Sequence, residues 1–228
     1  MENGMKRCVA VFVLAALCSA GAVGPPQSPS SKARPGLDAK VEAFLESHAG
    51  EWYDMNVPSV DGRTLHDLVL KNKYRSALEI GTSTGHSGIW IAWALSKTGG
   101  KLITIEIDES RHREAMKNFK EASLSDFIDA RLADAHRLVP ELKGPFDFVF
   151  SDADKEWYTN YFIAVSPKLA VGGCFTAHNV SAYRRRYGFG RDGGSQGFLE
   201  YVLGLPNYET TVNSSGGGIS ISYKKSDT

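Results

Sequence analysis

The sequence has no excess charge of either sign and few cysteines. The 26 Lys and Arg residues balance the 26 Asp and Glu residues over 228 positions, so no net field draws the protein toward nucleic acid or an anionic membrane surface. Cys8 and Cys18 lie in an apolar N-terminal run, which leaves Cys174 alone in the rest of the chain. A disulfide framework is therefore excluded, and the expected partner is a small molecule bound at a local site, not a nucleic acid.

The N-terminal residues differ in composition from the rest of the chain. Lys6 and Arg7 precede an uninterrupted run of apolar and small residues that ends at Val23, which predicts a secretory signal peptide over 1–23. Residues 24–35 are rich in Pro, Ser and Gly and predict a disordered linker. The expected location is secreted or periplasmic, without stable membrane contact after signal removal. A cytoplasmic protein with a misassigned start and an uncleaved membrane anchor stay open as alternatives.

Residues 36–228 show the alternating patterns of one α/β domain. Helical patterns at 37–56 and 62–71 precede the first strand. Strand-like runs then alternate with helix-length segments, which is typical of parallel strands joined by right-handed crossovers. The last two runs are joined by a Ser-Gly turn, which predicts an antiparallel hairpin. We expect a Rossmann-like, seven-stranded, mostly parallel sheet with helices on both faces. The predicted strands are 76–80, 101–107, 127–132, 146–151, 173–177, 208–213 and 218–224.

Polar and glycine residues follow the first three predicted strands. A Gly-rich turn begins at Gly81, where ligands of open parallel sheets bind, but its spacing lacks G-x-G-x-x-G and does not favour a dinucleotide. Glu106 ends the second strand, where a carboxylate can accept hydrogen bonds from both hydroxyls of a ribose. Asp134 follows the third strand and can hold an adenine amino group. Either carboxylate can also be a helix N-cap, but the ordered set predicts a nucleoside site.

Further motifs occur in a fixed order along the chain, and together they resemble class I S-adenosylmethionine-dependent O-methyltransferases of the catechol and caffeoyl-CoA type. The resemblance implies transfer of a methyl group to a hydroxyl of a small, aromatic, catechol-like acceptor, and a homodimer. The motifs are Val57-Pro58, Glu79-Ile80-Gly81-Thr82-Ser83-Thr84-Gly85-His86-Ser87, Ile105-Glu106-Ile107-Asp108, Ala133-Asp134-Ala135, Asp152-Ala153-Asp154-Lys155, Gly172-Gly173 leading to Asn179, and Gly218-Ile219-Ser220.

The same resemblance implies which residues contact S-adenosylmethionine. Glu106 is expected at the ribose, and the Gly81 turn around the methionine part. The full set of cofactor-binding residues implied is Val57, Glu79, Gly81, Ser83, Ser87, Glu106, Asp134, Ala135 and Asp152.

Asp152 and Lys155 follow the fourth predicted strand, where the acceptor hydroxyl would be activated. A hydroxyl near pKa 10 is mostly protonated at neutral pH, so a metal must lower its pKa or a general base must take its proton. Lys155 resembles the lysine that accepts or steers this proton in the family. The family holds its metal with the first Asp of this motif and with an Asp-Asn pair after the fifth strand, but this sequence has His178-Asn179 at the pair.

His178 is the main departure from the family's pattern. A metal held by Asp152, His178 and Asn179 has an imidazole nitrogen among its ligands, which favours manganese, iron, cobalt or zinc over magnesium. Alternatively the metal is lost, His178 is the catalytic base, and Asp152 orients it or the cofactor. Two other functions stay open: an S-adenosylmethionine-binding protein without methyltransferase activity, and a metal-independent methyltransferase acting on another class of small molecule.

Overall fold

The structure is a computed structural model that describes Met1, residues 36–180 and residues 193–228. The predicted signal peptide and linker over 1–35 lie, apart from Met1, outside the described residues. The domain boundary and the location of the protein therefore stay predictions. Within the described ranges, no helix is both long enough and apolar enough to span a bilayer.

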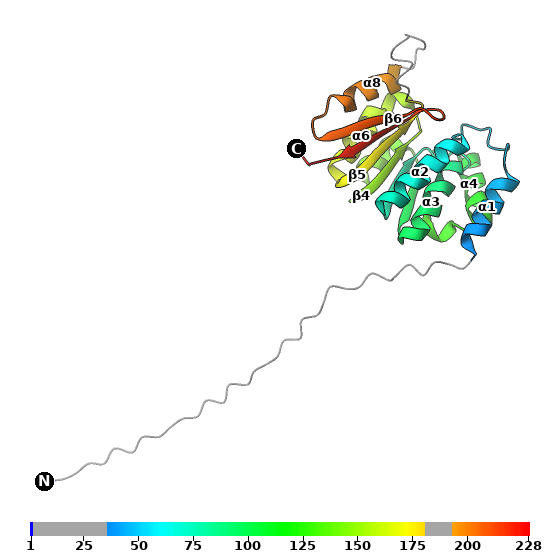
Figure 1. Ribbon diagram of the computed structural model, residues 1–228, viewed down its shortest axis with the longest axis horizontal. Coiled ribbons are helices and arrows are strands. Elements are labelled where there is room, and N and C mark those ends of the chain that lie inside the picture. The colour runs from blue at the N-terminus through cyan, green and yellow to red at the C-terminus, as the bar shows by residue number, and fades with distance from the viewer. Residues whose placement is uncertain (2–35, 181–192) are drawn as a thin grey trace. The chain divides into compact units, whose positions relative to one another are not determined.

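A seven-stranded sheet organises the domain, in the order β3-β2-β1-β4-β5-β7-β6 (Figure 1). The first five strands are parallel, whereas β7 is antiparallel to both β5 and β6. The predicted Rossmann-like sheet and its C-terminal hairpin are therefore confirmed. The strands are β1 (Ser76–Ile80), β2 (Lys101–Glu106), β3 (Ile128–Leu132), β4 (Phe146–Ser151), β5 (Leu169–His178), β6 (Tyr208–Asn213) and β7 (Ile219–Lys224).

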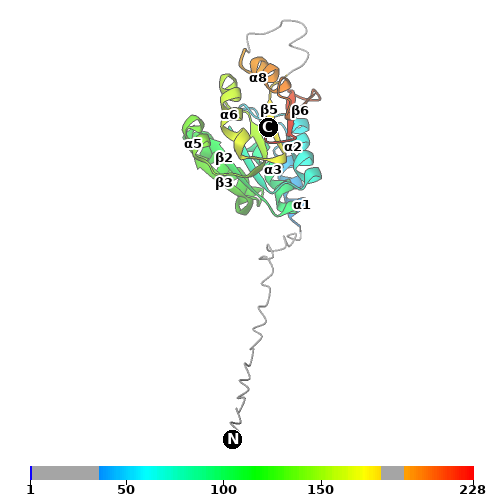
Figure 2. The same ribbon diagram turned by 90° about the vertical axis from the view of Figure 1, so that its left-hand side faces the viewer.

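Helices cover both faces of the sheet, as predicted (Figures 1 and 2). Successive side chains of a strand point to opposite faces, so Phe148 and Phe150 of β4 pack into one apolar core and Val149 into the other. The first core is covered by α1 (Leu37–Ser47), α2 (Ser59–Asn72), α3 (His86–Thr98) and α4 (Glu109–Glu121). The second is covered by α5 (Ala135–Glu141), α6 (Tyr158–Val165) and α8 (Gly193–Leu203). Short 3-10 turns are η1 (Ser125–Phe127), η2 (Lys155–Trp157) and η3 (Ser166–Lys168).

Two elements differ most from the sequence prediction. The first helix ends at Ser47 instead of residue 56, because the chain turns at Gly50, whose φ of 89° favours glycine. The fifth strand begins at Leu169 and ends at His178. This longer strand places His178 at the carboxyl edge of the sheet, beside the end of β4 and the start of β7.

Candidate active site

A cavity of about 690 Å³ lies at the carboxyl ends of the five parallel strands. Each strand end contributes to its wall: Gly81 after β1, Glu106 of β2, Asp134 after β3, Asp152 after β4 and His178 of β5. The strand order reverses between β1 and β4, which is where ligands of open α/β sheets bind. The structure thus brings the ends of β1, β2 and β3, where the sequence predicts a nucleoside site, together with the ends of β4 and β5.

Most of the other predicted site residues also line the cavity. These are Ser83, Ser87, Ala135, Lys155 and Asn179. Val57 and Glu79 lie behind the wall instead. The Val57 carbonyl is 2.8 Å from His86 Nδ1, and Glu79 accepts a hydrogen bond of 2.5 Å from the Thr104 hydroxyl. Their contacts with a cofactor stay predictions.

The turn after β1 is held against the neighbouring strand. The backbone N–H groups of Gly81 and Thr82 both donate to the Ile105 carbonyl, at 3.0 and 3.1 Å. Gly81 has φ 96°, and a Cβ there would lie 2.9 Å from the backbone of Asp152. Glycine is therefore required at this position, because any side chain would push the ends of β1 and β4 apart.

Glu106 is fixed by three backbone N–H groups. Its Oε1 accepts from Ile107 and Asp108 at 3.0 and 2.9 Å, and its Oε2 accepts from Ser83 at 2.7 Å. A carboxylate has about four acceptor positions, so one remains on Oε2. In this arrangement Glu106 can accept a hydrogen bond from one ribose hydroxyl, whereas the sequence analysis expects it to accept from both.

Asp134 is both a helix cap and a cavity residue. Its Oδ1 accepts a hydrogen bond of 2.9 Å from the backbone N–H of His136 at the start of α5. Its Oδ2 has a distant cationic neighbour, Arg137 Nε at 3.8 Å. The capping role and the predicted adenine contact are therefore compatible, because they use different oxygens.

An aromatic and acidic cluster beside Asp134 was missed by the sequence analysis. The His136 ring stacks on Trp157 at 3.7 Å between centroids, and its Nε2 is 2.9 Å from Asp154. The Tyr161 hydroxyl donates to the other oxygen of Asp154 at 2.8 Å. His136 lies in α5, whereas the other three residues lie between Asp154 and Tyr161, in or next to η2 and α6. No single sequence motif therefore shows that they meet.

Residues 54–56, before the predicted Val57-Pro58 motif, form another part of the site that the sequence did not indicate, and Met55 and Asn56 line the cavity. The Ser83 hydroxyl donates to the carbonyl of Asp54, and Asn56 donates to the Thr84 hydroxyl at 2.8 Å. Arg111 binds the Asp54 carboxylate through two hydrogen bonds of 2.8 and 3.0 Å. These contacts tie the segment to the Gly81 turn and to α4.

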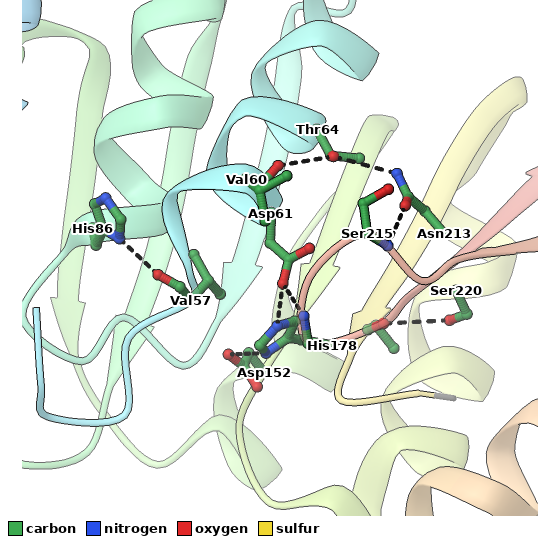
Figure 3. Close-up of polar contacts among 12 residues, drawn as sticks. Val57, Val60, Asp61, Thr64, His86, Asp152, His178, Asn213, Ser215 and Ser220 are labelled. Carbon is green, nitrogen blue, oxygen red and sulfur yellow. Dashed lines mark hydrogen bonds and ion pairs between the residues drawn. The ribbon is translucent and has the colours of Figure 1, made fainter. Parts of the chain in front are cut away.

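His178 lies between two carboxylates (Figure 3). Its Nε2 is 3.0 Å from Asp61 Oδ2, and its Nδ1 is 3.1 Å from Asp152 Oδ2. The second contact is an ion pair that is not aligned as a hydrogen bond. The side chains of His178, Asp61 and Asp152 are 5%, 0% and 11% exposed. Asp61 lies in the first turn of α2, where acidic residues are common, so its sequence context carries no functional signal.

The two carboxylates control the charge of His178. Burial alone lowers the pKa of the imidazole, because it penalises the charged form. The adjacent carboxylates of Asp152 and Asp61 outweigh burial and raise the pKa to about 9. At neutral pH the ring is therefore a buried cation between two anions.

This pKa makes the stability of the fold depend on pH. The folded pKa lies above the ordinary value of 6.5, so the stabilisation is complete below pH 6.5 and is lost as pH rises through about 9. We expect His178→Gln to cost on the order of 3 kcal/mol at pH 6 and much less at pH 10. Urea unfolding at both pH values measures the difference. His48→Gln, at a half-buried imidazole, is the control. An equal loss of unfolding free energy by His178→Gln at the two pH values would contradict the raised pKa of His178.

The placement of His178 bears on the predicted metal site. Asp152, His178 and Asn179 all line the cavity. Among residues 36–180 and 193–228, however, no three His, Cys, Asp or Glu side chains are arranged to hold a metal ion. A metal ligand must present a free lone pair to the ion, whereas both nitrogens of His178 face carboxylates. As placed, this set does not fit a divalent ion.

Comparisons with known proteins show the family to which the chain is similar. A sequence model of the O-methyltransferase family matches residues 28–182, more than half of the chain. Catechol O-methyltransferase of Niastella koreensis is 39% identical over 130 residues, covering 55% of this chain and 58% of that protein. Catechol O-methyltransferase domain-containing protein 1 of Mus musculus is 31% identical over 158 residues, covering 67% and 59%. The matched segments thus span less than two thirds of these relatives.

Solved structures resemble the fold over most of its length. An O-methyltransferase from Bacillus cereus in complex with SAH has a TM-score of 0.71 at 28% identity, covering 82% of this chain and 91% of that one. The O-methyltransferase TomG of Streptomyces achromogenes in complex with SAM has a TM-score of 0.68 at 26% identity, covering 85% and 91%. From the matching family model, the fold and the site at its strand ends, the chain belongs to the O-methyltransferase family.

Proposed function

We propose that the protein transfers a methyl group from S-adenosylmethionine to a hydroxyl of a small, catechol-like aromatic acceptor. The cavity carries this proposal, because one continuous wall joins the Gly81 turn and Glu106 to Asp152 and Lys155. Its volume of about 690 Å³ lies within the range of small-molecule sites. The names of the relatives and the SAH and SAM bound in two similar structures support the same activity.

The two ends of the cavity have different chemistry. The Gly81 turn, Glu106 and Asp134 form a cofactor end suited to an amino acid and a nucleoside. Asp152 and Lys155 line the same cavity, and we assign them to the methyl acceptor and call their part of the cavity the acceptor end. S-adenosylmethionine bound at the cofactor end would supply a methyl group on a positively charged sulfur.

Transfer to oxygen forms an O–C bond and breaks the C–S bond, whose electron pair stays on sulfur. The acceptor hydroxyl loses its proton, which Lys155 accepts or steers, and Asp152 orients the hydroxyl by accepting a hydrogen bond. Asp152 and Lys155 both line the cavity. The protein therefore contributes the alignment of the two reactants and the removal of the proton. Export and a homodimer remain predictions from the sequence.

Product analysis tests the activity. We expect the purified protein, incubated with S-adenosylmethionine, to add one methyl group to 1,2-dihydroxybenzenes and none to aliphatic diols or aromatic amines, as read by mass spectrometry. Methylation of amines or aliphatic alcohols would indicate a different acceptor class. Cofactor binding without any methylated product would favour the alternative of a binding protein.

A further inference from the structure

Asp61 lies behind the acceptor end, in contact with His178. Asp61 is fully buried and does not line the cavity. Its Oδ2 accepts hydrogen bonds from His178 Nε2 at 3.0 Å and from the backbone N–H of Gly217 at 2.6 Å. Its Oδ1 has no hydrogen-bond partner among residues 36–180 and 193–228. A buried carboxylate with an unsatisfied oxygen is costly, so a functional reason for keeping it is worth seeking.

Asp61 contacts the cavity through His178, which lines it. The ring of His178 connects it to Asp152, whose Oδ1 in turn lies 3.4 Å from the Tyr158 hydroxyl. Figure 3 shows the three side chains following one another from the start of α2 to the end of β4. The chain of contacts therefore ends on the carboxylate at the acceptor end.

The imidazole occupies the space that a cation between these carboxylates would need. A Cβ added to Gly217 would lie 2.6 Å from His178 Nε2, so backbone closes this side of the ring. On the other side, Asp152 is already at 3.1 Å from Nδ1. The ring therefore fills the space between Asp61 and Asp152, and a cation could enter it only by displacing the imidazole.

We propose that Asp61 is a positioning residue: acting through His178, it fixes the Asp152 carboxylate at the acceptor end, and methyl transfer needs no divalent metal there. This inference rests on the proposed function for its catalytic part. Its structural part, that a histidine ring fills the cation position, stands on the contacts alone.

Manganese binding tests the structural part without any turnover. Chelator-stripped protein is titrated with Mn²⁺, and free ion is read by electron paramagnetic resonance. We expect no stoichiometric binding by the wild type. His178→Asp leaves three carboxylates together, a donor set suited to a hard divalent cation, and should gain a Mn²⁺ site. Stoichiometric binding by the wild type, or no gain in folded His178→Asp, would overturn the proposal.

Kinetics test the positioning role. We expect Asp61→Asn to lower kcat/KM for the acceptor by about 10- to 100-fold through misplacement of Asp152, with unchanged affinity for S-adenosylmethionine. The control is Asp38→Asn, which disturbs an ion pair with Lys97 outside the cavity and should leave both parameters unchanged. Wild-type turnover should persist in chelator. Full activity of Asp61→Asn, or loss of wild-type activity in chelator, would contradict the proposal.

Methyl transfer activity and the filling of the cation position by His178 are tested by different measurements. If the wild type methylates no acceptor, the proposed function is wrong, and the Mn²⁺ titration still decides whether His178 fills the cation position. If the wild type is active but binds Mn²⁺ at Asp152, the function holds and the metal-free network is wrong.

Discussion

Replacing Lys155 with methionine is expected to lower turnover by roughly 10²- to 10⁴-fold, the range for loss of a group that moves a proton in the transition state. Methionine keeps most of the length of the side chain but can neither accept a proton nor carry a charge. Lys155 lines the cavity at the acceptor end and is not among the residues assigned to the cofactor, so affinity for S-adenosylmethionine should stay nearly unchanged. Steady-state kinetics and a calorimetric titration of the same sample separate the two effects.

Lys143→Met is the matched control for this variant. Lys143 is exposed in the segment that precedes β4, at the edge of the sheet opposite the cavity. It should therefore have wild-type kinetics. If Lys155→Met also turns over at the wild-type rate, Lys155 has no part in proton removal, and Asp152 becomes the remaining candidate at the acceptor end.

The second large effect is expected at Glu106. Glu106→Gln keeps the shape of the side chain but removes its charge and replaces one oxygen with an amide donor. That donor would oppose a backbone N–H group, either that of Ser83 or those of Ile107 and Asp108. Because a charged hydrogen bond contributes about 1.5–3 kcal/mol, we expect affinity for S-adenosylmethionine to fall by roughly 10- to 100-fold.

The control for Glu106→Gln is Glu109→Gln. Glu109 is exposed in the first turn of α4, where it pairs with Arg113. Its loss should leave the affinity unchanged. Equal cofactor affinity of Glu106→Gln and the wild type would mean that the ribose does not bind at the end of β2.

Much of the fold could be predicted because its strands are short apolar runs with clear ends. The five parallel strands and the hairpin lie where the pattern places them, and a polar residue at each strand end must meet the others at one edge of the sheet. Glu106 and Asp134 could therefore be assigned to the cavity from sequence. The first helix was overextended because a periodic pattern does not reveal the turn at Gly50.

Contacts between distant segments could not be predicted in the same way. Asp61 is separated from His178 by 117 positions, and nothing in the first turn of α2 distinguishes it from an ordinary acidic residue. The sequence therefore left open whether His178 is a metal ligand or acts without metal. The structure resolves the surroundings of the ring, because it shows a carboxylate facing each nitrogen.

The central claim is that the cavity at the ends of β1 to β5 binds S-adenosylmethionine. Calorimetric titration of the purified protein with S-adenosylmethionine, in chelator and again with added Mn²⁺, tests it most directly. We predict one binding site per chain with the same affinity in both conditions. Absence of binding in both would contradict the assignment of the Gly81 turn and Glu106, and with it the proposed activity.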